Sequence, residues 1–80
     1  MDSYVKIKLA IPLAEYKLQV TFEDNRQKIF DLSSLVHSPL CKDWKDPMFF
    51  NHVALYEHRG AVFWPNGFDI DAETLLSKYS

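Results

Sequence analysis

The chain has 80 residues and a formal net charge of −2. Apolar residues make up 48% of it, and aromatic residues make up 15%. This composition predicts one small domain with a real core and excludes a disordered chain. The single cysteine excludes an internal disulfide framework, and the mild acidity argues against direct binding of nucleic acid, which requires a basic patch.

The first residues lack the basic and apolar stretches of a signal peptide, and no apolar run approaches the roughly 18 residues that a membrane span needs. We therefore expect a cytoplasmic protein without membrane contacts. We also expect a single domain over residues 1–80, because no linker, repeat or low-complexity segment interrupts the chain.

Three strand-like segments open the chain. Apolar residues at every second position from Val5 to Ile11 predict a half-buried strand with Leu9 and Ile11 on its apolar face, ending at Pro12. Segment 17–23 shows the same period of two, and segment 27–32 returns as a third strand. They flank Asp24-Asn25, a pair that tolerates the positive φ values of a two-residue hairpin.

Short helical signals follow. Residues 33–36 predict a helical turn, residues 40–45 a connection, and Asp46 followed by proline predicts a cap for a short helix over 48–52. Residues 53–57 and 61–64 predict two further strands, joined by a turn at 58–60. The run Trp64-Pro65-Asn66-Gly67 ends the last strand and reverses the chain. Asp69 or Asp71 then caps a terminal helix, and Asp71 fits better because an acid follows it in the first turn.

The order of these segments predicts the fold class. Three strands, short helical segments, two strands and a terminal helix, all with tight connections, favour antiparallel neighbours over parallel crossovers. We therefore expect a small two-layer α+β domain with an antiparallel sheet of about five strands.

Few residues suggest chemistry. Zinc favours histidine and cysteine, but His37, Cys41, His52 and His58 have none of the close pairs that mark a zinc site. A lone cysteine is most often a small apolar filler, and two glycines cannot form a phosphate-binding loop. We expect no metal, no cofactor, no catalytic residue and no enzymatic activity.

Two sets of side chains are candidates for contacts with a partner. Acids that fall in connections could form a negative patch facing a basic surface: Glu23, Asp24, Asp43, Asp46, Asp69, Asp71 and Glu73. Aromatic residues, too many for one small core, could form an exposed patch: Trp44, Phe49, Phe50, Tyr56 and Trp64.

An ordered set of motifs also resembles a known family. The set is Leu18-x-Val20-x-Phe22-Glu23-Asp24-Asn25, Phe30-Asp31-Leu32, Asp46-Pro47-x-Phe49-Phe50 and Val62-x-Trp64-Pro65-Asn66-Gly67-x-Asp69-Ile70-Asp71-x-Glu73-Thr74-Leu75. Over about residues 4–76 it is similar to the bacterial family catalogued as domain of unknown function 2442. One departure is Asp24-Asn25, where the family usually has glycine second. The resemblance implies a small α+β domain with an accessory or partner-binding role, and carries over no catalytic residue.

Two functions remain open. The first is a non-enzymatic protein-interaction module, antitoxin-like or accessory, whose partner is the product of a neighbouring gene. The second is an inhibitor encoded by a phage or mobile element, similar to an anti-CRISPR protein, whose acidic patch mimics DNA and occupies the nucleic-acid-binding surface of a host defence complex. In either case we expect a protein partner and a monomer or weak dimer.

Overall fold

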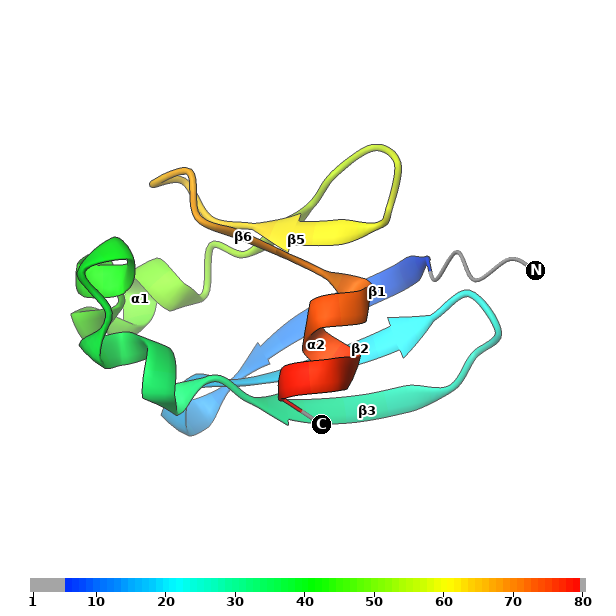
Figure 1. Cartoon of the computed structure of the whole chain (residues 1–80), viewed down its shortest axis with the longest axis horizontal. Helices are drawn as coiled ribbons and strands as arrows, with labels where there is room; N and C mark the ends of the chain where they lie inside the picture. Colours follow the sequence, from blue (N-terminus) through cyan, green and yellow to red (C-terminus); the bar gives the residue numbers. More distant parts are fainter. Residues whose placement is uncertain (1–5, 80) are drawn as a thin grey trace.

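The computed structural model describes residues 6–79 and shows two small antiparallel sheets (Figure 1). Sheet A has the strand order β1 (Ile7–Leu13), β2 (Lys17–Phe22) and β3 (Gln27–Asp31), and sheet B has the order β4 (Ala54–Leu55), β5 (Ala61–Phe63) and β6 (Asp69–Asp71). The helical segments are η1 (Ala14–Tyr16), η2 (Ser33–His37), η3 (Pro39–Lys45), α1 (Pro47–Phe50) and α2 (Ala72–Lys78).

The predicted α+β class is confirmed, and the prediction of one sheet of about five strands is corrected to two sheets of three. The sixth strand arises because the turn after Trp64 leads back along β5 before the last helix begins. Trp64 N donates to Phe68 O at 2.9 Å, and Gly67, with φ of 91°, donates to Trp64 O at 3.0 Å. Val5, predicted in the first strand, lies outside the described residues.

The predicted hairpin of β2 and β3 is present, but its turn has three residues. Phe22 N donates to Arg26 O at 2.8 Å, and Asn25 N donates to Phe22 O at 2.8 Å. Asn25 takes the left-handed conformation with φ of 71°, and Asp24 Oδ1 accepts from Arg26 N at 3.0 Å. A type I turn followed by a left-handed residue is a common way to close a three-residue hairpin.

A bulge in β1 overturns the predicted orientation of its second half. Ile7 pairs with Phe22 but Leu9 pairs with Thr21, so Lys8 is an extra residue on β1. One inserted residue moves every following side chain to the other face of the sheet. Leu9 and Ile11 are therefore 48% and 38% exposed instead of facing inward.

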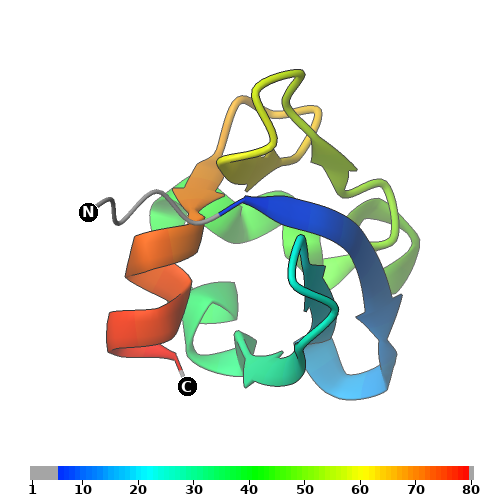
Figure 2. The same cartoon turned by 90° about the vertical axis from the view of Figure 1, so that its right-hand side faces the viewer.

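The core lies between the two sheets and is closed at one end by η3 and α1 (Figure 2). Trp44 and Trp64 are completely buried, with ring centroids 4.6 Å apart, and Phe50 lies 4.9 Å from Trp44. The sheets are joined where Ile7 N donates to Arg59 O at 2.6 Å. α2 covers the side of the core between β6 and β3 (Figure 1), with Leu75 completely buried.

Asp71 caps α2, as predicted, since its Oδ1 accepts from Thr74 N at 2.7 Å. These bonds from Thr74 lower the pKa of Asp71 below its ordinary value of 3.8. A carboxyl whose pKa is lowered on folding stabilises the fold above its unfolded pKa, and this contribution is lost as the pH falls through the folded-state pKa.

We expect Asp71→Ala to lower the free energy of unfolding by about 1 kcal/mol near neutral pH. Urea unfolding at neutral and acid pH measures both this loss and its disappearance below pH 3.8. Asp71→Asn is the control, because asparagine caps helices nearly as well without titrating. Equal losses of unfolding free energy for the two variants would show that the capping hydrogen bond itself does not stabilise the fold.

Candidate functional site

The outer face of sheet B carries polar and aromatic side chains that no other described segment covers. Val62 and Ile70 pair across β5 and β6 and point into the core, where they are 0% and 5% exposed. Side chains alternate along a strand, so Phe63 and its partner Asp69 point outward, as does Asp71. Phe63 is half-buried, and both acids are exposed.

Three rings form a continuous stack on this face, which we call the aromatic stack: Phe63, Tyr56 and His58. The centroids of Tyr56 and Phe63 are 4.5 Å apart at an interplanar angle of 27°, and those of Tyr56 and His58 are 5.3 Å apart at 18°. Nδ1 of His58 accepts from Gly60 N at 2.9 Å, which holds the last ring in place. The stack therefore presents ordered π surface beside solvent.

Asp69 is bonded to the centre of the stack. Tyr56 Oη donates to Asp69 Oδ2 at 2.8 Å, and this bond raises the pKa of Tyr56 above its ordinary value of 10.0. The phenol therefore stays protonated at neutral pH, and Asp69 keeps its second carboxylate oxygen for another donor. Asp71 follows two residues later on the same face, opposite Ala61, so a second carboxylate lies further along β6.

The arrangement suits recognition of a cation. Aromatic faces attract guanidinium and ammonium groups, and a carboxylate accepts charge-assisted hydrogen bonds from them. Nothing in the stack resembles a nucleophile paired with a base. Elsewhere, burial raises the pKa of the Cys41 thiol, so this side chain is a poor nucleophile at neutral pH.

No group of three or more histidine, cysteine or acidic side chains that could hold a metal ion occurs within residues 6–79. Over the same part of the chain, no helix is long and apolar enough to cross a membrane.

The seven predicted acids do not form one patch. Glu23 and Asp24 lie in the β2–β3 turn, where Arg59 and Arg26 contact their carboxylates at 3.4 Å and 2.6 Å. Asp43 and Asp46 lie at the opposite end of the molecule, whose long axis is 38 Å (Figure 1). Asp46 also caps α1, where its Oδ1 accepts from Met48 N at 3.0 Å. Asp69, Asp71 and the exposed Glu73 form the third group, on β6 and at the start of α2.

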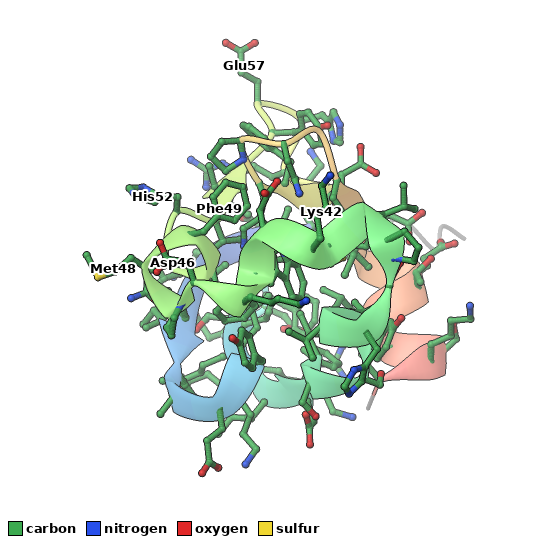
Figure 3. The ribbon with its side chains drawn as sticks, turned by 90° about the vertical axis from the view of Figure 1, so that its left-hand side faces the viewer. Lys42, Asp46, Met48, Phe49, His52 and Glu57 are labelled. Atoms are coloured by element: carbon green, nitrogen blue, oxygen red, sulfur yellow. The ribbon has the colours of Figure 1, made fainter. Side chains whose placement is uncertain are left out.

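Three of the predicted aromatic contacts belong to the core instead. Trp44 and Trp64 are 0% exposed and Phe50 is 2% exposed, so none of them is available to a partner. Trp64 Nε1 donates to Phe50 O at 2.9 Å inside the core. Phe49 is half-buried at the η3–α1 end, beside Asp46 and His52 (Figure 3). Tyr56 is a predicted aromatic residue whose side chain is hydrogen-bonded to the carboxylate of a predicted acid, Asp69.

Phe63 and His58 were not predicted as contacts. Phe63 lay in an apolar run interpreted as a buried or half-buried strand, and His58 was placed in the turn before that strand and weighed as a metal ligand. The period of two along β5 contained the signal for Phe63, because a buried Val62 requires its neighbour to face outward.

Nearly the whole chain matches a known protein family. The sequence profile of the family described as "Protein of unknown function (DUF2442)" matches residues 7–79. The chain belongs to the DUF2442 family. The resemblance that the motifs indicated is thus confirmed, and every residue of the aromatic stack and its two acids lies within the DUF2442 match. No curated protein and no solved structure matches the chain.

Proposed function

We propose that this DUF2442 protein is a non-enzymatic interaction module that binds a basic segment of a protein partner on the outer face of sheet B. The observation that carries the proposal is the aromatic stack, which is partly exposed and hydrogen-bonded at its centre to Asp69. Exposed, ordered aromatic surface rimmed by polar groups is typical of sites that bind other proteins.

The chemistry of the face favours arginine or lysine in the partner. A guanidinium group lying on the outer face of Phe63, an end ring of the stack, gains the attraction of the ring beside the carboxylate of Asp69, which pairs with Phe63 across β5 and β6. Opposite charges across an interface also speed association and select the partner. These contacts are exposed and are screened by salt, so the binding should weaken as ionic strength rises.

The partner's role follows from this chemistry only in outline. A product of a neighbouring gene with a basic surface would make the domain antitoxin-like or an accessory subunit. An inhibitor of a nucleic-acid-binding complex would use the same face, but with Asp69, Asp71 and Glu73 alone, because the other predicted acids lie elsewhere. The first role is better supported, since few acids remain on the face to mimic a polyanion.

We expect a short arginine–glycine peptide to shift the NMR signals of Tyr56, His58 and Phe63 more than those of any other region. Asp69→Asn, which keeps an acceptor for Tyr56, and Tyr56→Ala should each weaken binding about two- to fivefold. Asp43→Asn is the matched control, because it removes one exposed acid at the far end of the molecule and should leave the affinity unchanged.

The same variants test the natural interaction. A column carrying the wild-type domain or Asp43→Asn should retain a protein from the host lysate that the Tyr56→Ala/Asp69→Asn double variant does not retain. If Asp43→Asn weakens peptide binding as much as Asp69→Asn does, the attraction is general electrostatics and the assignment of this face is wrong.

A further inference from the structure

The outer face of sheet A is a second surface with exposed apolar side chains, distinct from the aromatic stack. Three rows of outward-facing residues cross it: Leu9–Thr21–Gln27, Ile11–Gln19–Ile29 and Leu13–Lys17–Asp31. The opposite face packs on the core through Leu18, Val20 and Phe30, all completely buried. On the outward rows Leu9, Ile11 and Ile29 are 48%, 38% and 56% exposed, whereas Thr21 on the central strand is buried and Leu13 lines a pocket with Pro47 and Asn51 at the α1 end.

The bulge at Lys8 is what creates this surface. Without it, the even period of β1 would turn Leu9 and Ile11 toward the core and leave Ala10 outside. Instead the small Ala10 fits inside opposite Val20, and the larger side chains face outward beside Thr21 and Gln19. The bulge thus leaves two large apolar residues in contact with solvent, which makes this face a candidate surface for another molecule.

The charges on the face favour a second copy of the same chain. The nine positions carry one cation, Lys17, and one anion, Asp31, paired across β2 and β3 in the last row. A strongly basic or acidic partner would meet both signs together, whereas a second copy brings equal apolar surface and one charge of each sign. We infer that two chains pack through the outer faces of sheet A about a two-fold axis that lies along the middle row.

This axis matches apolar side chains with one another and each charged side chain with an uncharged polar one. Rotation about the middle row places Ile29 on Ile29 of the second copy and Leu9 on its Leu13. The same rotation places Asp31 on Gln27 and Lys17 on Thr21, so each charged group meets a hydrogen-bonding side chain. An axis along the strands would instead place Leu13 on Asp31 and leave a buried carboxylate against an apolar residue, which is unfavourable. Two sheets packed this way retain a small angle between their strands because each is twisted.

The size of the face sets the expected strength. Three strands about 4.8 Å apart and three rows about 6.8 Å apart give a footprint of roughly 300 Å². A stable interface covers about 800 Å² on each partner. The dimer is therefore weak and forms at concentrations of roughly 0.1–1 mM.

Sedimentation velocity of the full chain between about 20 μM and about 2 mM tests the proposal. We expect the mean mass to rise toward that of a dimer over this range. Ile29→Lys should abolish the rise, since it sets two ammonium groups together at the axis, while Leu40→Lys, a change at an apolar residue 71% exposed outside this face, should not affect it.

Two further variants test the orientation. Gln27→Lys sets an ammonium group opposite the partner copy's Asp31 at two symmetric places and should tighten the dimer about three- to tenfold. Gln27→Glu sets two carboxylates together at the same places and should weaken it by a similar factor. Gln27 is exposed, so neither change disturbs folding.

A mass that stays monomeric at every concentration, or equal effects of lysine and glutamate at position 27, would overturn the inference. So would a dimer that Ile29→Lys leaves intact while the variant remains folded by circular dichroism. None of these variants touches the aromatic stack, so peptide binding there is an independent measurement.

Discussion

Alanine at Trp64 is expected to lower the free energy of unfolding by about 4 kcal/mol. A domain of this size has a total stability of roughly 4–12 kcal/mol, so the variant should lose between about a third and all of it. Trp64 is completely buried, and its ring lies 4.6 Å from Trp44 and 5.7 Å from Phe50. Its loss leaves a cavity at the point where β5 meets the segment of η3 and α1.

A comparison of phenylalanine at the two tryptophans isolates the hydrogen bond within this cluster. Trp64 Nε1 donates to Phe50 O at 2.9 Å, whereas Trp44 Nε1 is buried without a hydrogen-bond partner. The ring of Trp44 instead makes T-shaped contacts with the rings of Phe50 and Phe68, at interplanar angles of 74° and 87°. Both replacements remove similar volume from completely buried sites, so their packing losses should be similar.

We therefore expect Trp64→Phe to cost about 1 kcal/mol more than Trp44→Phe, the net value of one buried hydrogen bond. Urea unfolding curves of the two variants, compared at equal m-values, measure the difference. If Trp44→Phe is the more destabilising variant, the expected ranking is wrong. The Nε1 group of Trp44 would then contribute more to stability through its contacts with neighbouring rings than the hydrogen bond of Trp64 does.

Local signals in the sequence predicted several features of the fold. The turn at Asn66-Gly67, the cap at Asp46 before Pro47 and the cap at Asp71 each depend on a few adjacent residues, and all three are present. The features that failed depend on distant parts of the chain. Whether residues 54–55 join β3 or pair only with β5 is decided by the packing of the whole core, so the split into two sheets had no local signal.

The candidate site shows the same division. Tyr56 and Asp69 were predicted separately, as an aromatic and as an acid, but their hydrogen bond depends on how β4, β5 and β6 pair. Trp44 was expected in a connection, and only tertiary packing turns that 3-10 helix so that the ring is buried. The bulge at Lys8 likewise left no trace, because residues 5–11 show an unbroken period of two.

The connection between β1 and β2 holds two adjacent residues in an unfavourable conformation. Glu15 and Tyr16 both have φ of 62°, in the left-handed region that costs residues other than glycine about 1 kcal/mol each. Tyr16 is held there by its contacts: its ring lies 5.4 Å from Phe50 and stacks on Trp44 at 6.5 Å, and its carbonyl accepts from Leu32 N at 2.9 Å. Glu15 has only an exposed ion pair with Lys17 at 3.7 Å.

Glycine at these two positions should therefore have opposite effects. Glu15→Gly should raise the free energy of unfolding by about 0.5 kcal/mol, because it relieves the backbone and loses only a surface ion pair. Tyr16→Gly relieves the same strain, but it should lower the free energy of unfolding by about 2 kcal/mol or more, because the ring contacts are lost. Glu15→Ala is the control that removes the side chain without relieving φ. Thermal or urea unfolding measures all three, and a Glu15→Gly variant no more stable than Glu15→Ala would mean that the fold stores no strain here. The expected ranking would instead identify Tyr16 as the residue that keeps the end of sheet A anchored on the aromatic core.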